Sequence, residues 1–152
     1  MPARIYECGR EEAQALKKAL EYDPYLDPKV IPPSKYDEKD LKKLTPEQRK
    51  EYDEEQARIK EALKKLNEDP YSSVIFTRQD YDLRDGTTMG MPGKFYLYLN
   101  ANEEFLALAE GKLAKDFKSV KRADPETEKK VIEFINEEES KANVGIGSIF
   151  GG

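Results

Sequence analysis

The strongest constraint on what this chain can fold into is the order of its apolar periodicities. Segments in which apolar residues run together or alternate with polar ones predict strands, and they lie at 3–8, 73–83, 94–99 and 118–123. Segments with apolar residues three and four apart predict helices, and they lie at 11–22, 45–67, 102–117 and from 125 onward. The predicted order is strand, helix, helix, strand, strand, helix, strand, helix.

Apart from the helix at 45–67, this order matches a ferredoxin-like split βαβ arrangement. We therefore predict an α+β fold with a ferredoxin-like split βαβ core, an inserted helix, and a C-terminal helix followed by a tail. The domain is expected to span residues 1–144, and an apolar, glycine-rich tail to span 145–152.

The stretch 23–44 is predicted to be a proline-rich, semi-rigid arm. It carries several apolar residues among its prolines, so we expect it to lie against the domain or against a partner. The charged helix at 45–67 has a strong start signal. Thr45 can cap it, Pro46 suits its first position, and Gln48 can complete a capping box.

Composition narrows the class of protein. The net charge is −5, so the overall field does not attract nucleic acid or an anionic membrane. A single cysteine, Cys8, excludes an intramolecular disulfide. No apolar run is long enough to span a membrane and the N-terminus lacks a signal-peptide core, so a cytoplasmic location is expected. The prevalence of Lys and Glu is typical of thermophile proteins.

The sequence offers little for catalysis. It has no histidine, which removes the commonest general base and metal ligand, and we expect Cys8 to be a core residue. Asp80, Asp82 and Asp85 resemble part of a calcium loop, but the required glycine and glutamate positions hold Asp85 and Met91. A weak metal site formed by these carboxylates stays an alternative, because oxygen-ligand sites have no strict sequence pattern. We predict a protein that is not an enzyme and has no metal and no cofactor.

Two further segments could form a surface that binds a partner. The loop at 86–93, rich in methionine and glycine, is either a contact surface or an ordinary hairpin loop. On an open sheet, Tyr96 and Tyr98 could stack on RNA bases beside a basic stretch. The candidate basic residues are Lys118, Lys121 and Arg122. Solvated lysines explain that stretch equally well.

The C-terminus carries the most specific signal. Three glutamates at 137–139 precede a short spacer, and residues 145–151 read Gly-Ile-Gly-Ser-Ile-Phe-Gly. This ending resembles the tail of the acidic stalk proteins of archaeal ribosomes. The resemblance implies that the tail docks as a short helix into a groove on translation GTPases, with Ile146, Ile149 and Phe150 as anchors. Their spacing is also that of a helix-in-groove ligand.

Other interpretations of the tail sequence stay open. From Asn143 the spacing is similar to a sliding-clamp-binding peptide, the final Gly151-Gly152 is similar to ubiquitin-like modifiers, and the tail could fold back on its own sheet. We predict an adaptor that docks a protein partner through the tail, either a translation GTPase or ribosome or a larger complex. The alternatives are an accessory subunit of a larger enzyme complex and an RNA-binding ferredoxin-like module. No membrane partner is expected, and nucleic acid only through a complex.

Overall fold

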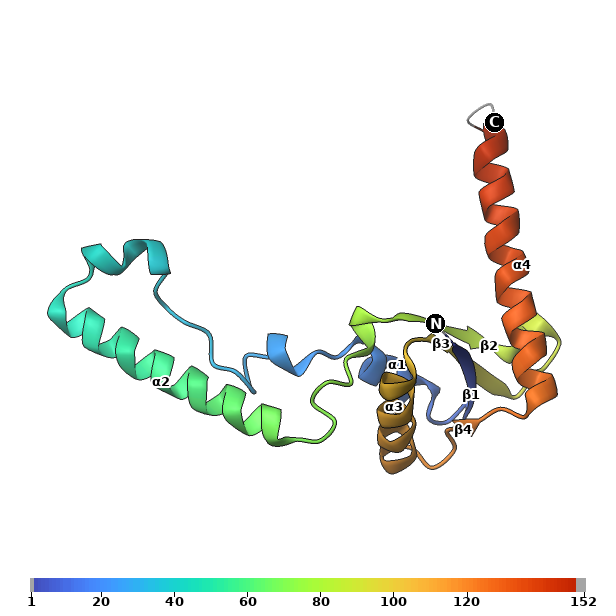
Figure 1. Cartoon of the computed structure of the whole chain (residues 1–152), viewed down its shortest axis with the longest axis horizontal. Helices are drawn as coiled ribbons and strands as arrows, with labels where there is room; N and C mark the ends of the chain where they lie inside the picture. Colours follow the sequence, from blue (N-terminus) through green and yellow to red (C-terminus); the bar gives the residue numbers. More distant parts are fainter. Residues whose placement is uncertain (1, 150–152) are drawn as a thin grey trace. The chain divides into compact units, whose positions relative to one another are not determined.

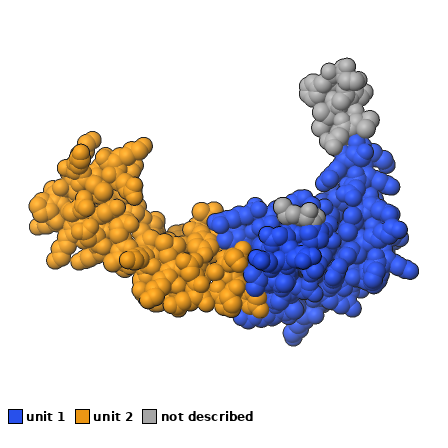
Figure 2. All heavy atoms as spheres, in the orientation of Figure 1, with its two compact units in different colours: residues 1–21, 74–152 blue, residues 22–73 orange. Residues whose placement is uncertain are grey.

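The computed structural model describes residues 2–149, with the side chains of 2–141. The chain divides into two compact units (Figure 2). Residues 1–21 and 74–152 form unit 1, and residues 22–73 form unit 2. The predicted arm and the inserted helix both fall in unit 2.

Unit 1 contains a four-stranded antiparallel sheet (Figure 1). Its strands are β1 (Ala3–Gly9), β2 (Asp80–Asp85), β3 (Lys94–Asn100) and β4 (Lys121–Arg122), in the spatial order β2-β3-β1-β4. The helices are α1 (Ala13–Glu21), α3 (Glu103–Asp116) and α4 (Pro125–Ile149). The fold is α+β, as predicted, and this order is compatible with a ferredoxin-like split βαβ core.

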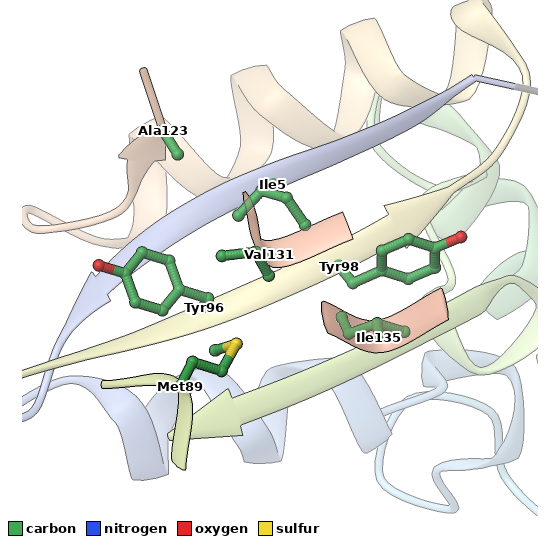
Figure 3. Close-up of a cluster of buried hydrophobic side chains, with 7 residues drawn as sticks. All are labelled: Ile5, Met89, Tyr96, Tyr98, Ala123, Val131 and Ile135. Carbon is green, nitrogen blue, oxygen red and sulfur yellow. The ribbon is translucent and has the colours of Figure 1, made fainter. Parts of the chain in front are cut away.

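The two faces of the sheet pack against different helices. One face carries alternate strand residues such as Tyr6, Leu97 and Leu99, which are fully buried together with Leu16 of α1 and Leu106 of α3. Successive strand side chains point to opposite faces, so the residues between them form a second layer. A set of buried side chains joins this second layer to α4 (Figure 3): Ile5, Met89, Tyr96, Tyr98, Ala123, Val131 and Ile135.

The predicted strand at 73–83 is correct only in its second half. Val74, Ile75 and Phe76 are all buried, which does not fit the alternating exposure of a half-buried strand. They lead into a short 3-10 turn, Phe76–Arg78, and β2 begins only at Asp80. The ring of Phe76 packs edge-on against Phe105, with centroids 5.8 Å apart. These residues close one end of the core instead of pairing in the sheet.

Unit 2 is built on α2 (Pro46–Glu68), whose start confirms the predicted capping box. Thr45 Oγ1 accepts the Gln48 backbone N–H at 3.2 Å, and Gln48 Oε1 accepts the Thr45 N–H at 3.0 Å. Two short 3-10 turns, Pro24–Leu26 and Glu38–Lys43, interrupt the arm. The arm lies against α2: Tyr36 donates its hydroxyl to Glu51 Oε2 at 2.9 Å, and Tyr25 donates to Asn67 Oδ1 at 2.7 Å.

Candidate functional site

The helix that leads to the predicted tail anchors is α4. Asp124 caps its start by accepting the Thr127 N–H at 2.8 Å, and this bond lowers the pKa of Asp124. Val131 and Ile135 are buried against the sheet, but every side chain from Asn136 to Lys141 is exposed. The helix therefore packs on the sheet over its first three turns and then extends past it (Figure 1).

The backbone of α4 stays helical through Ile149, so there is no break at the predicted tail boundary of residue 145. Of the three predicted anchors, Ile146 and Ile149 lie within this helix and Phe150 lies outside the described residues. At about 1.5 Å per residue, Ile149 is about 21 Å further along the helix axis than Ile135. The segment that carries the anchors is thus a continuation of a helix already fixed to the sheet.

An ion-pair cluster lies where α4 leaves the sheet. The Arg84 guanidinium of β2 donates to Asp82 Oδ2 at 2.6 Å and forms an ion pair with Glu138 of α4. The bond to Asp82, and then Glu138, raises the pKa of Arg84. Arg84 therefore tethers α4 to the edge of the sheet three residues after its last buried side chain.

The tyrosines predicted to stack on RNA are not on an open surface. Tyr96 and Tyr98 are 5% and 8% exposed because Val131 and Ile135 cover that face (Figure 3). Burial raises the pKa of both tyrosines. The open sheet face that RNA stacking would need is therefore covered, because the C-terminal helix that the sequence predicted packs on it.

The basic residues of that prediction are not brought together either. Lys121 contacts Glu7 Oε1 at 3.3 Å, whereas its neighbour Arg122 pairs with Glu128 at 3.0 Å. Each of these two cations is therefore paired with a different carboxylate of its own chain. Lys118 is exposed, and its backbone N–H donates to Glu12 Oε2 at 3.2 Å.

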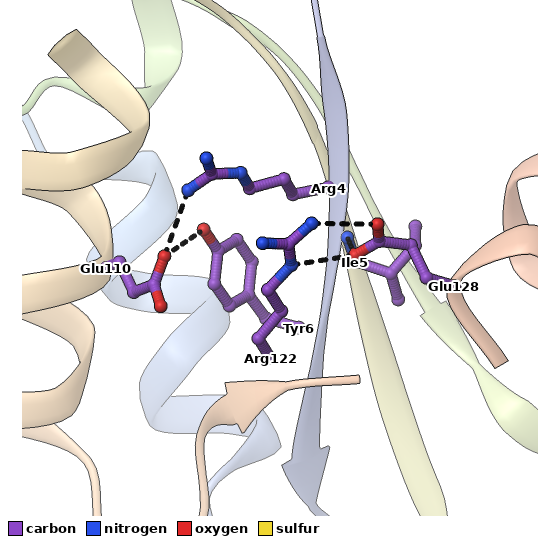
Figure 4. A network of polar contacts seen from close by, with 6 residues as sticks. All are labelled: Arg4, Ile5, Tyr6, Glu110, Arg122 and Glu128. Atoms are coloured by element: carbon purple, nitrogen blue, oxygen red, sulfur yellow. Dashed lines mark hydrogen bonds and ion pairs between the residues drawn. The ribbon is translucent and has the colours of Figure 1, made fainter. Parts of the chain in front are cut away.

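Arg122 belongs to a network that closes the edge of β1 (Figure 4). Because β4 is only two residues long, the Ile5 N–H is left without a strand partner, and Glu128 Oε2 accepts it at 3.2 Å. On the other side of the network, Glu110 Oε2 accepts from the Tyr6 hydroxyl at 3.2 Å. Burial raises the pKa of Tyr6 to about 12.

The same Glu110 oxygen accepts from Arg4 at 3.1 Å (Figure 4). Two guanidiniums, Arg4 and Arg122, therefore face two carboxylates, Glu110 and Glu128. The charges of the network balance, so it leaves no excess charge with which to attract a ligand.

An apolar groove of about 310 Å³ lies beside β2, on the face opposite α4. Its lining comprises Lys17, Leu20, Glu21, Tyr81, Leu83 and Phe95. This groove was not predicted from the sequence. The alternation of Tyr81 and Leu83 with charged residues was a visible signal for one apolar strand face, but nothing in the sequence showed that α1 would leave that face partly uncovered.

The remaining candidates have structural partners. Asp85 accepts from Arg10 at 3.0 Å and from the Thr87 N–H at 2.9 Å, so it holds a turn. The loop after β2 turns inward, with Met89 buried in the core under α4. Cys8 is buried, as expected, and burial raises its thiol pKa. Among residues 2–141, no group of three or more acidic or cysteine side chains is placed to hold a metal ion.

None of the described helices is both long enough and apolar enough to cross a membrane. Comparison with protein families, with curated proteins and with solved structures finds no match to this chain.

Proposed function

We propose that the chain is a protein-binding adaptor that presents the end of α4 to a partner. The observation that carries this proposal is the path of α4, which packs on its own sheet only as far as Ile135 and continues as a helix to Ile149. Residues 136–141 of this helix are all exposed, so this stretch costs chain ordering without covering its own sheet, and a docking role for the end of the helix accounts for it.

The anchors of this proposal are Ile146, Ile149 and Phe150. Their spacing in the sequence places them on one side of a helical turn, which is the pattern read by hydrophobic grooves. The exposed residues before them include Glu137 and Glu139. An acidic helix with an apolar end fits a groove that has basic residues along its rim, because complementary charge orients the encounter while apolar burial supplies most of the affinity.

The partner class we propose is a translation GTPase, from the resemblance of the tail to the archaeal stalk proteins. In a titration calorimeter, a purified archaeal-type elongation GTPase should bind the full-length protein. Ile149→Asp combined with Phe150→Asp should weaken binding at least 100-fold, because two buried anchors are lost. Leu26→Asp is the matched control, since Leu26 is 80% exposed in unit 2. Equal binding by the tail variant would refute the proposal.

Salt and nuclease distinguish this proposal from RNA binding. Phosphate contacts weaken steeply as salt rises, because counterions are released on binding. Apolar docking of the tail should be far less sensitive to salt. Binding that survives moderate salt and nuclease supports the adaptor. An association lost under either treatment, and indifferent to the tail substitutions, would favour RNA.

A further inference from the structure

The strand β2 is one of the two outer strands of the sheet, and no other strand of the described chain pairs with its free edge. Such an edge offers a row of backbone donors and acceptors for one more strand. Beside this edge lies the apolar groove formed by Leu20, Tyr81, Leu83 and Phe95. The edge and the groove share residues, so one occupant could use both.

We propose that the occupant is a second copy of this chain, with the two β2 strands paired antiparallel around a two-fold axis at Leu83. A two-fold axis perpendicular to the sheet keeps each face continuous across the junction, and it makes the interface self-complementary, as closed dimers require. The result is one eight-stranded sheet with α4 of both copies on the same side. This inference does not depend on the proposed function of the tail.

The charge pattern of β2 argues for a second copy. In antiparallel strands, directly opposite residues share a face. With Leu83 on the axis, Asp82 of each copy faces Arg84 of the other. These two side chains already touch within one chain at 2.6 Å, and Arg84 also pairs with Glu138. In the dimer each Arg84 would therefore lie among its own two carboxylates and Asp82 of the other copy. The neighbouring register, centred on Asp82, would instead set two aspartates against each other, which is unfavourable.

On the groove face, this register sets Leu83 against Leu83 and Tyr81 against Asp85 of the other copy. The side chain of Leu83 lies on the groove side, as does that of Tyr81, and both are only partly buried in one copy. Across the axis the two Leu83 side chains would meet and the two grooves would become neighbours. Each copy would thus cover apolar surface that the single chain leaves in water, which is favourable.

Sedimentation equilibrium of the full-length protein tests the proposal. The unmodified chain should show a monomer–dimer equilibrium over micromolar to millimolar concentrations. Asp82→Arg alone sets two arginines across the axis, and Arg84→Asp alone sets two aspartates there, so each variant should be monomeric. An equimolar mixture of the two variants restores opposite charges at both positions and should form a heterodimer. A monomeric unmodified chain, dimeric single variants or a monomeric mixture would each overturn the proposal.

A second experiment does not rely on charge reversal. Leu83→Cys places one thiol from each copy at the axis, where mild oxidation should link them into a disulfide dimer in most of the sample. Leu26→Cys, at an 80% exposed position in unit 2, is the matched control and should give little dimer. The native Cys8 is buried and is expected to stay reduced. Equal yields from the two variants, or no dimer with Leu83→Cys, would refute the pairing.

Discussion

The interior of unit 1 and the interior of unit 2 are stabilised by different kinds of interaction. Unit 1 contains almost all of the fully buried apolar side chains, on both faces of its sheet. Among residues 22–73, all of which the structure describes, Tyr52 is the only buried apolar side chain. A buried charged residue, Glu55, follows it three positions later on α2. Unit 1 therefore derives its stability from apolar burial, and unit 2 depends on capping, hydrogen bonds and partial burial. The two units should therefore respond to different substitutions.

The largest expected effect is a core deletion in unit 1. Leu97 is fully buried, so Leu97→Ala should lower the free energy of unfolding by about 2–5 kcal/mol. The matched change Ile59→Ala, on the half-buried stripe of α2, should cost about 1 kcal/mol, since less apolar area is lost. Chemical denaturation followed by segment-resolved hydrogen exchange measures both. Similar costs at the two sites would contradict the comparison.

Unit 2 also contains a buried carboxylate, Glu55, that holds the arm. Glu55 Oε2 accepts from Ser34 Oγ and from the Lys35 N–H, both at 3.2 Å. Glu55→Ala leaves these donors unpaired and should destabilise unit 2 by about 1–3 kcal/mol. The adjacent Glu54 is exposed, so Glu54→Ala serves as control and should change little. Hydrogen exchange over residues 30–60 would show the difference. No increase with Glu55→Ala would indicate that the arm is held by other contacts.

The features that the sequence predicted well are local ones. The capping box at Thr45 and the helix start at Asp124 depend on residues within one turn, and their chemistry can be read from neighbouring positions. Long-range packing could not be read in this way. The burial of Tyr96 and Tyr98 depends on which face α4 covers, and no periodicity in either segment encodes that choice.

The candidate sites show the same contrast between local features and long-range packing. The apolar pattern of Ile146 and Ile149 was visible in the sequence, but the exit of α4 from the sheet after Ile135 was not. Equally, the alternation at Tyr81 and Leu83 predicted a strand face. Its groove arises only because β2 is an edge strand.

Removal of the helix cap should give a smaller effect in unit 2. Thr45→Ala abolishes the side-chain acceptor for the Gln48 N–H and should cost about 1 kcal/mol. Thr45→Ser keeps the acceptor and is the control, with stability close to that of the unmodified chain. Segment-resolved exchange at the start of α2 measures both variants. Equal exchange in the two would mean that the capping box contributes nothing measurable.

Acid should loosen unit 2 slightly through Glu51. Lys35 donates to this carboxylate at 3.1 Å and Tyr36 at 2.9 Å, and these bonds lower the pKa of Glu51 from 4.5. A carboxyl with a lowered pKa stabilises the fold above its unfolded value and loses that contribution as pH falls through its folded value. The protection factors of the arm amides, which correct for the slowing of intrinsic exchange in acid, should therefore decrease below pH 4.5. Glu51→Gln should remove the part of this dependence that Glu51 supplies; if its pH profile matched that of the unmodified chain, Glu51 would not be a responsible group.

The most direct test of the docking account is a hydrogen-exchange footprint of the full-length protein with a purified archaeal-type elongation GTPase. We predict that amides of residues 142–149 become protected on binding, because the end of α4 enters a groove on the partner. Amides of β1 and β3 should be unchanged, since the sheet takes no part. Protection confined to the sheet or to unit 2, or no protection at a saturating concentration of the GTPase, would contradict the account.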